Sequence, residues 1–327
     1  MFNALLITEQ PDKTFTRAVV QRDLAALPVN DTLIHVHYSS LNYKDALSAS
    51  GNKGVTRNYP HTPGIDAAGV VESSSNPDLQ PGDEVIVTSY DLGMNTAGGF
   101  GQYIRVPSAW VIKKPAGLSL RDSMIYGTAG LTAGISVDIL LAHGVVPSKG
   151  EVLVTGATGG VGCLSVMILA KLGFNVVAAT GKLDQIDWLK SIGATSVVDR
   201  KAISDNSRPM LKERWAGVVD TVGGDMLSVA IKSTKAHGCV AACGNVASVE
   251  LHTTVFPFIL RGVVLAGSDS GMLPMPERTA IWGKMAADWK PANLESIVDE
   301  VDLYGLGPKI DAILQGQIRG RVVVTLD

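Results

Sequence analysis

Cysteine is scarce in this chain of 327 residues, which contains only Cys163, Cys239 and Cys243. None of them forms a C-x-x-C pair, so the sequence argues against a disulfide framework and against a four-thiolate zinc site. The first ten residues, MFNALLITEQ, lack the basic start, apolar stretch and cleavage site of a signal peptide. We therefore expect a reduced, cytoplasmic protein.

Basic clusters and long apolar runs are also missing. The net charge is −3 and no run of Lys and Arg is present, so the electrostatic footprint of a nucleic-acid binder is absent. No stretch reads as the roughly 18 apolar residues of a membrane-spanning helix. The strongest candidate, FPFILRGVVLAG, is interrupted by Arg261. We expect neither nucleic acid nor a membrane as a partner.

Glycine and apolar residues, in contrast, are plentiful, with 35 glycines and 46% apolar residues. Buried parallel strands explain such a composition because they read as unbroken runs of Val, Ile and Leu. The chain is longer than the roughly 100–200 residues of one usual domain. Two domains are therefore expected.

The pattern of the chain changes near residue 122. Before this point, short strands alternate with Gly, Pro and Asp, which is typical of a small, partly open barrel. Residues 120–144 read as helical, with Gly144 as the stop. After them come apolar strands and helices in alternation, which predicts a parallel sheet with right-handed crossovers. The expected strands are 151–155, 175–179, 196–198, 216–220, 239–242 and 263–267, and the expected helices are 160–172 and 183–192.

These patterns predict an α/β protein in which a β-rich domain precedes a doubly wound parallel sheet. Residues 305–326 read as a helix and a strand that return to the first domain. The predicted domains are therefore residues 1–122 with 271–327, and residues 123–270.

A glycine-rich loop, GATGGVG at residues 156–162, lies between a predicted strand and a predicted helix. This context favours a dinucleotide-binding loop, although the motif fits G-x-G-x-x-G only if Ala157 replaces the first glycine. Free amides at the start of the helix would hold the pyrophosphate. The contacts are expected from Thr158, Gly159, Gly160 and Val161. The alternative is a tight turn without a ligand.

The end of the second strand of this sheet indicates which dinucleotide binds. NAD enzymes place an acidic residue here to bind the ribose hydroxyls, whereas this chain has Thr180, Gly181 and Lys182. Arg200 follows the next strand and is expected at the same corner. Hydroxyl and cationic groups suit a 2′-phosphate, so NADPH is favoured over NADH. The alternative is that both cations are merely solvated.

Several further motifs together resemble the medium-chain dehydrogenase/reductase superfamily. They are PGIDAAGVV (63–71), PGDEV (81–85), GTAGLTA (127–133) and the glycine loop. Five others narrow the resemblance to the zinc-free YhdH/AcuI group of quinone-oxidoreductase-like proteins, the NADPH-dependent acrylyl-CoA reductases. They are SSLNYKDAL (39–47), DTVGG (220–224), VAACG (240–244), FPFILRGV (256–263) and GSDS (267–270).

The resemblance implies a GroES-like catalytic domain, a Rossmann domain and a cofactor in the cleft between them. Zinc members of the superfamily carry Gly-His-Glu where this chain has Gly64, Ile65 and Asp66, and their early cysteine ligand falls near Asn42. Ile65 has no ligand atom, and zinc needs three or four N, S or O ligands. We therefore expect no metal.

Candidate catalytic residues follow from the same resemblance. Asn42, Tyr43 and Asp45 are expected in a short polar break after a strand, facing the nicotinamide. Asp66 and Arg321 complete the catalytic set, and the alternative is that Asp45 and Asp66 only cap turns and pair with cations. The resemblance also implies cofactor contacts from Tyr43, Asn245, Ile259, Ser270 and Arg321, and the last four are expected after strand ends.

Three functions remain open at this point. The first is NADPH-dependent reduction of acrylyl-CoA or a related enoyl thioester, because hydride transfer to an electron-poor carbon needs no metal. The second is quinone reduction, and the third is nucleotide binding without catalysis. The apolar strand RGVVLAG is expected at an exposed sheet edge, which favours a homodimer.

Overall fold

The structure of the protein, a computed structural model, describes residues 1–326. It divides into two compact units. Unit 1 contains residues 1–128 and 271–286 and the chain from Ile297 onward, and unit 2 contains residues 129–270 and 287–296.

Unit 1 is built mainly of β-strands. Its strands are β1 (Phe2–Glu9), β2 (Phe15–Arg22), β3 (Thr32–Leu41), β4 (Asp66–Ser74), β5 (Glu84–Thr88), β6 (Tyr103–Val106), β7 (Ile112–Lys113), β14 (Val298–Asp302) and β15 (Arg321–Thr325). Its helices are α1 (Tyr43–Ala49), α7 (Met275–Ala286), α8 (Leu306–Leu314) and the short 3-10 turns η1 (Leu24–Ala26) and η2 (Ser108–Trp110).

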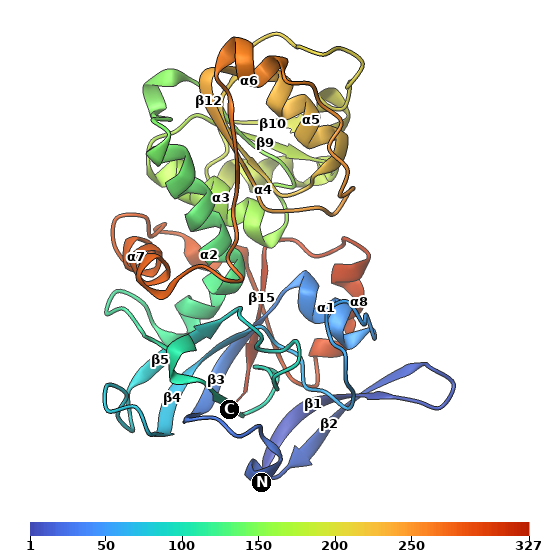
Figure 1. Ribbon diagram of the computed structural model, residues 1–327, viewed down its shortest axis with the longest axis vertical. Helices are drawn as coiled ribbons and strands as arrows, with labels where there is room; N and C mark the ends of the chain where they lie inside the picture. Colours follow the sequence, from blue (N-terminus) through green and yellow to red (C-terminus); the bar gives the residue numbers. More distant parts are fainter. Residues whose placement is uncertain (327) are drawn as a thin grey trace. The chain divides into compact units, whose positions relative to one another are not determined.

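The main sheet of unit 1 is organised around β3. Its strand order is β14-β15-β3-β4-β5-β7, and β6 pairs with β3 off this path. One end of β3, at Thr32–His35, pairs with β6, while the other end, at Tyr38–Leu41, pairs with β15. The predicted return of the C-terminal strand to the first domain is therefore confirmed (Figure 1).

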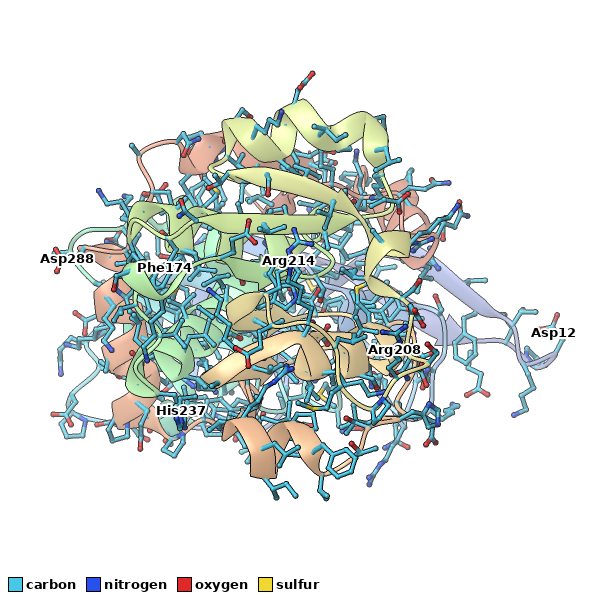
Figure 2. The ribbon with its side chains drawn as sticks, turned by 90° about the horizontal axis from the view of Figure 1, so that it is seen from above. Asp12, Phe174, Arg208, Arg214, His237 and Asp288 are labelled. Carbon is cyan, nitrogen blue, oxygen red and sulfur yellow. The ribbon has the colours of Figure 1, made fainter. Side chains whose placement is uncertain are left out.

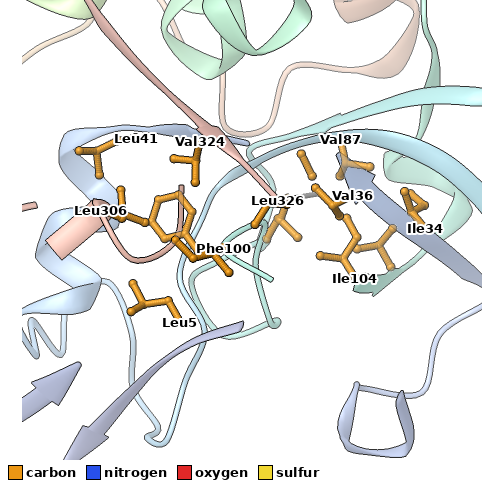
Figure 3. Close-up of a cluster of buried hydrophobic side chains, with 14 of the residues drawn as sticks. Leu5, Ile34, Val36, Leu41, Val87, Phe100, Ile104, Leu306, Val324 and Leu326 are labelled. Atoms are coloured by element: carbon orange, nitrogen blue, oxygen red, sulfur yellow. The ribbon is translucent and has the colours of Figure 1, made fainter. Parts of the chain in front are cut away.

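Alternation along the strands places one face of each in the core of unit 1. Figure 3 shows the buried cluster, in which strands β1, β3, β5, β6 and β15 meet helix α8. Its labelled members include Leu5, Ile34, Val87, Leu306 and Val324. The β1–β2 hairpin forms a separate two-stranded sheet, and Asp12 lies at its tip (Figure 2).

Unit 2 is a doubly wound parallel sheet. Every neighbouring pair is parallel, in the order β10-β9-β8-β11-β12-β13. Counted along the chain this order is 3-2-1-4-5-6, the arrangement of dinucleotide-binding Rossmann folds. The strands are β8 (Val152–Val154), β9 (Val176–Thr180), β10 (Ser196–Asp199), β11 (Trp215–Asp220), β12 (Thr234–Ala242) and β13 (Val264–Gly267).

Helices connect these strands (Figure 1). They are α3 (Gly160–Lys171), α4 (Ile186–Ser191), α5 (Gly224–Ser233) and α6 (Phe256–Arg261), with the 3-10 turns η3 (Pro147–Lys149), η4 (Leu183–Gln185) and η5 (Arg200–Ile203). One further 3-10 turn, η6 (Leu294–Ile297), precedes β14. The residues predicted as one helix, 183–192, are thus a 3-10 turn followed by a short α-helix, and strand 239–242 begins five residues earlier, at Thr234.

Helix α2 (Leu120–Ala142) ends close to the predicted stop at Gly144, but it is not continuous. Gly127 has a non-helical backbone, with φ of 51° and ψ of −155°, so two helical segments meet there. In length and composition α2 resembles a membrane-crossing helix, which the sequence reading missed, but most of it is buried inside the protein. A core helix of a soluble protein meets the same criteria.

Candidate active site

Helix α1 begins directly where β3 ends, and Asn42 is its N-cap residue. The Asp45 carboxylate accepts a hydrogen bond from the Asn42 backbone N–H at 2.7 Å, one half of a capping box. The short polar break expected at residues 42–45 was therefore wrong. These residues form the start of a helix, and this local pairing fixes the direction of its first turn.

A buried carboxylate, Asp66, gathers side chains from three segments. Its Oδ2 atom accepts hydrogen bonds from Ser40 Oγ at 2.6 Å and from Asn42 Nδ2 at 2.7 Å. Its Oδ1 atom accepts from the Thr128 backbone N–H at 2.8 Å and from Thr128 Oγ1 at 2.6 Å. Asp66 is 0% exposed, so these four donors replace the water that a carboxylate needs.

Arg321, on β15, supplies the positive charge of the cluster. Its Nη2 atom lies 3.9 Å from Asp66 Oδ2 and donates to Ser40 Oγ at 2.8 Å. Its Nε atom donates to the Ile125 carbonyl oxygen at 2.9 Å. Arg321 is only 3% exposed, so the guanidinium and the carboxylate form a buried pair, and loss of either partner would leave the other unpaired.

The contacts of Asn42 fix the orientation of its side-chain amide. Arg321 Nη1 can only donate, so the atom 3.3 Å away must be Asn42 Oδ1. The amide nitrogen then faces Asp66 at 2.7 Å, with Asp45 Oδ2 at 3.2 Å. Both N–H groups are thereby engaged by carboxylates. Asn42 therefore has no free N–H donor for a substrate.

Tyr43 differs from its neighbours because its side chain is 43% exposed. The structure records no hydrogen bond from its hydroxyl to any residue between 1 and 326. Of the two side chains considered as donors to a substrate oxygen, Tyr43 is the one with an available O–H group.

Asp45 is the second fully buried carboxylate of the cluster. Burial raises its pKa to about 7, and the nearby charge of Asp66 acts in the same direction. Backbone N–H groups of Asn42 and Ile65, at 2.7 and 2.8 Å, oppose this change. Arg321 pairs with Asp66 and not with Asp45, so the cluster contains a proton-binding group near neutral pH.

Three residues of this cluster, Ser40, Gly127 and Thr128, were not recognised from the sequence. A Cβ at Gly127 would lie 2.4 Å from Asp66 Oδ2 and 2.5 Å from Ser40 Oγ, and the φ of 51° is also unfavourable for other residues. The signal was present, because all three lie within the motifs SSLNYKDAL and GTAGLTA. Their contacts, however, depend on how α2 and β4 pack.

In unit 2 the glycine-rich loop joins β8 to α3, and Gly159 is the N-cap of the helix. A Cβ at Gly162 would lie 2.3 Å from the Gly156 carbonyl oxygen, so this glycine permits close packing. A Cβ at Gly159 would meet only that oxygen, at 3.4 Å. The backbone of Gly159 has a φ of −79°, which other residues also adopt, so its conformation does not require glycine. The space beside its Cα is open. Together with the free amides at the start of α3, this fits a pyrophosphate group.

The predicted corner for the 2′-phosphate lies at the end of β9. Thr180 is the last residue of the strand, and its Oγ1 accepts a hydrogen bond from the Lys182 backbone N–H at 3.0 Å. A Cβ at Gly181 would lie 2.7 Å from Arg200 Nε, which shows that the Arg200 side chain packs over this glycine. Arg200 is exposed and makes no ion pair within residues 1–326.

The remaining predicted cofactor contacts lie in three different settings. Asn245 is exposed and follows the end of β12, and Ser270 follows β13 and contacts Thr132 Oγ1 at 2.7 Å. Ile259 does not follow a strand end, so that expectation was wrong. It lies inside helix α6 and is 68% exposed. The same expectation was wrong for Arg321, which is the first residue of β15.

Among residues 1–326, the structure places no group of three or more His, Cys, Asp or Glu side chains that could hold a metal ion. Ile65, at the position of the histidine ligand in zinc members, is 3% exposed and donates its backbone N–H to Asp45.

Comparison with known proteins agrees with this architecture. Residues 28–116 match the alcohol dehydrogenase GroES-like domain, and residues 160–286 match the family described as zinc-binding dehydrogenase. The acrylyl-CoA reductase AcuI of Ruegeria pomeroyi is 44% identical over 332 residues, 100% of both chains. The chain belongs to the AcuI/YhdH group of the medium-chain dehydrogenase/reductase family.

Solved structures of this group carry different dinucleotides. Escherichia coli YhdH with bound NADPH has a TM-score of 0.96 and 42% identity, over 99% of this chain and 100% of the other. Bacillus subtilis yhfP with NAD bound has a TM-score of 0.97 and 44% identity, over 99% of both chains. The latter protein, named "Putative quinone oxidoreductase YhfP", is 46% identical over 92% of each chain. The GroES-like and Rossmann folds expected from the sequence are thus confirmed.

Proposed function

We propose that this protein reduces the activated C=C bond of acrylyl-CoA, or of a related enoyl thioester, with NADPH to give the saturated thioester. The observation that carries the proposal is the full-length, 44% identity to an acrylyl-CoA reductase. The open glycine loop of unit 2 and the polar cluster of unit 1 support it. In this proposal residues 1–122 and 271–327 act on the substrate, and residues 123–270 bind the cofactor.

Unit 2 has the residues to hold the dinucleotide, and bound NADPH supplies the hydride. Amides of Gly160 and Val161, with Thr158 and the open space beside Gly159, bind the pyrophosphate at the positive end of α3. Thr180, Gly181, Lys182 and Arg200 bind the 2′-phosphate. Asn245, Ile259 and Ser270, together with Tyr43 and Arg321 of unit 1, complete the proposed contacts.

The preference for NADPH rests on the two cations near Gly181. Lys182→Ala and Arg200→Ala should each raise the Kd of NADPH about tenfold or more, because a charge-assisted hydrogen bond to phosphate is lost. NADH lacks that phosphate, so its Kd should change little. Fluorescence titration with both cofactors measures the two effects, and equal losses would contradict the assignment.

Unit 1 acts on the thioester in this proposal. Reduction of an enoyl thioester by hydride moves negative charge onto the thioester oxygen before a proton reaches the α-carbon. Tyr43 donates its hydroxyl hydrogen bond to that oxygen, because Asn42 has no free N–H. Asn42, Asp45, Asp66 and Arg321 act as positioning residues that fix the start of α1, on which Tyr43 lies.

Tyr43→Phe tests this division of roles. Loss of one oxyanion donor commonly lowers kcat by about 10²–10³, with NADPH affinity largely retained. If NADPH affinity falls instead and kcat does not, Tyr43 positions the nicotinamide. Asn42→Ser, which shortens the side chain and breaks its contacts to Asp66 and Arg321, should also reduce the thermal midpoint, whereas Tyr43→Phe should not.

The acceptor is identified by comparing rates. Purified protein should oxidise NADPH only when an acceptor is added, with a higher kcat/KM for acrylyl-CoA than for benzoquinone. The likeness to YhfP favours quinone reduction as the second candidate, and a higher kcat/KM for benzoquinone would select it. NADPH binding without turnover of either acceptor would leave the third candidate, a nucleotide-binding protein.

We also propose that the protein works in the cytoplasm, without a metal, as a homodimer. Strand β13 forms one edge of its sheet, and the helix before it exposes Phe256 and Leu260. Apolar surface beside an open sheet edge favours pairing with a second copy. Light scattering should give a mass near twice the 34.3 kDa of one chain. A stoichiometric zinc in metal analysis would contradict the metal-free proposal.

A further inference from the structure

Unit 2 contains a buried carboxylate, Asp220, at the centre of its sheet. Asp220 is the last residue of β11, and β11 lies beside β8. The chain continues from β8 to one side of the sheet and from β11 to the other. Ligands of doubly wound sheets bind beside the strand ends at such a reversal. Asp220 is therefore placed where the glycine loop leaves β8.

The two oxygens of Asp220 join two different loops. Oδ1 accepts a hydrogen bond from Thr155 Oγ1 at 2.7 Å, and Thr155 is the first residue after β8. Oδ2 accepts from the Gly223 backbone N–H at 2.8 Å, in the loop that leads into α5. One side chain thus connects the start of the glycine loop to the loop after β11.

A second set of contacts strengthens the same junction. The Thr221 backbone N–H donates to Thr155 Oγ1 at 2.9 Å, and Thr221 Oγ1 donates to the Thr155 carbonyl oxygen at 2.9 Å. Because Thr155 Oγ1 accepts from Thr221, its own hydrogen must point to Asp220. A Cβ at Gly156 would lie 2.3 Å from Thr221 Oγ1, so the next residue of the loop packs directly on this junction.

The junction is costly to maintain, which indicates that its geometry matters. Asp220 is 0% exposed, and its pKa is raised because burial disfavours the ionised form. It forms no ion pair with any residue from 1 to 326. A buried carboxylate without a cation lowers the stability of the folded chain, and its hydrogen bonds offset part of that cost. We therefore look for the role of Asp220 in the two loops that these hydrogen bonds join.

We propose that Asp220 is a positioning residue for cofactor binding, which holds the glycine loop and the start of α3 in the geometry that fits a pyrophosphate. This role rests on the dinucleotide site of the proposed function. The role concerns the pyrophosphate, which NADPH and NADH share. It is therefore separate from the proposed 2′-phosphate site at Lys182 and Arg200.

Asp220→Asn tests the proposal with the full-length protein. Asparagine has the same size but presents one N–H₂ group where both neighbours donate. Fluorescence titration should show the Kd of NADPH raised about tenfold, and the Kd of NADH raised by the same factor. The kcat at saturating NADPH should stay within about twofold, because the groups acting on the substrate are unchanged.

Asp225→Asn is the matched control, because Asp225 lies in the first turn of α5 and is exposed. It should leave both Kd values unchanged. Thr221→Val, which removes only the Oγ1 contact to Thr155, gives a second measurement if Asp220→Asn does not fold, and it should weaken both cofactors severalfold.

The outcomes separate this inference from the proposed function. If the unmodified protein binds no NADPH, the proposed function fails. If it binds NADPH and the Asp220→Asn and Thr221→Val variants bind equally well, the positioning role is overturned. Tighter binding by Asp220→Asn would overturn it too, because repulsion between the Asp220 carboxylate and the cofactor phosphates would then be the larger effect. Weakening of NADPH alone would assign Asp220 to the 2′-phosphate corner instead.

Discussion

Asp66 in unit 1 and Asp220 in unit 2 are both fully buried, but their surroundings differ. Asp66 lies 3.9 Å from a guanidinium group and accepts four hydrogen bonds. Asp220 has no cation and instead accepts from the Thr155 hydroxyl and from backbone amides of the Gly223 loop. A buried cation makes the first cluster depend on charge balance. The second depends on hydrogen-bond geometry, so the two should respond differently to the same kind of change.

The largest effect is expected from removing the cation. Arg321→Ala leaves the Asp66 carboxylate buried without a counter-charge, and breaking such a pair typically costs about 3–5 kcal/mol of stability. Urea unfolding measures the change. Arg121→Ala is the control, since Arg121 pairs with Glu300 at a partly exposed position and should cost no more than about 1 kcal/mol. Similar losses in both variants would show that Asp66 does not need its cation.

A smaller effect should follow from crowding the same cluster without changing its charge. Gly127→Ala places a methyl group 2.4 Å from Asp66 Oδ2 at a residue with a positive φ. Strain and overpacking together should lower stability by about 2–3 kcal/mol. Gly283→Ala in α7 is the matched control, because a Cβ there meets nothing within 4 Å. That control should keep or raise stability, by up to about 1 kcal/mol.

The proton on Asp45 provides a third test, in the pH dependence of stability. Its pKa is raised from 3.8 to about 7 in the folded protein, so the folded state binds the proton more tightly than the unfolded state. The resulting stabilisation is present below pH 3.8 and is lost as the pH rises to about 7. The loss is about 1.4 kcal/mol per pH unit. Asp45→Asn removes this titration.

Urea unfolding of both proteins across that pH range measures the difference. The stability of the parent relative to Asp45→Asn should fall as the pH rises towards 7 and should be constant above it. A difference that does not vary with pH would show that the backbone donors of Asn42 and Ile65 keep Asp45 ionised throughout.

The smallest effect concerns Cys243, beside Asp220. Burial, followed by the charge of Asp220, raises the pKa of this thiol to about 12. The thiolate is the reactive form, so alkylation by iodoacetamide should be slow at pH 8 and severalfold faster in Asp220→Asn. Mass spectrometry identifies the modified residue. Asp225→Asn should react like the parent, and equal rates in all three proteins would remove Asp220 as a cause.

Much of unit 2 was predictable because its signals are local. The glycine loop follows an apolar strand and precedes a helix, and each feature is readable within a few residues of the next. The boundaries were less accurate. Ile259 was expected after a strand end, but it lies in α6, before the next strand begins at Val264.

The cluster of unit 1 was predictable only in part. Asn42, Asp45 and Asp66 were named from motifs and Arg321 from the resemblance as a whole, and the structure brings these side chains together. Ser40 and Thr128 were missed because their contacts join segments far apart in the sequence. The orientation of the Asn42 amide could not be predicted from the sequence either. It depends on a donor from β15, Arg321, and an acceptor from β4, Asp66, which both contact this side chain.

The place of β15 in the sheet also bears on how the chain matures during synthesis. Strand β15 lies between β14 and β3, so the ribosome releases the strand that completes this sheet only after all of β1 to β13. Asp45 and Asp66 must therefore wait, without Arg321, while the whole of the parallel sheet of unit 2 is made. Nascent chains that have not yet released β15 should expose these carboxylates to water and should be the species most accessible to chaperones and proteases.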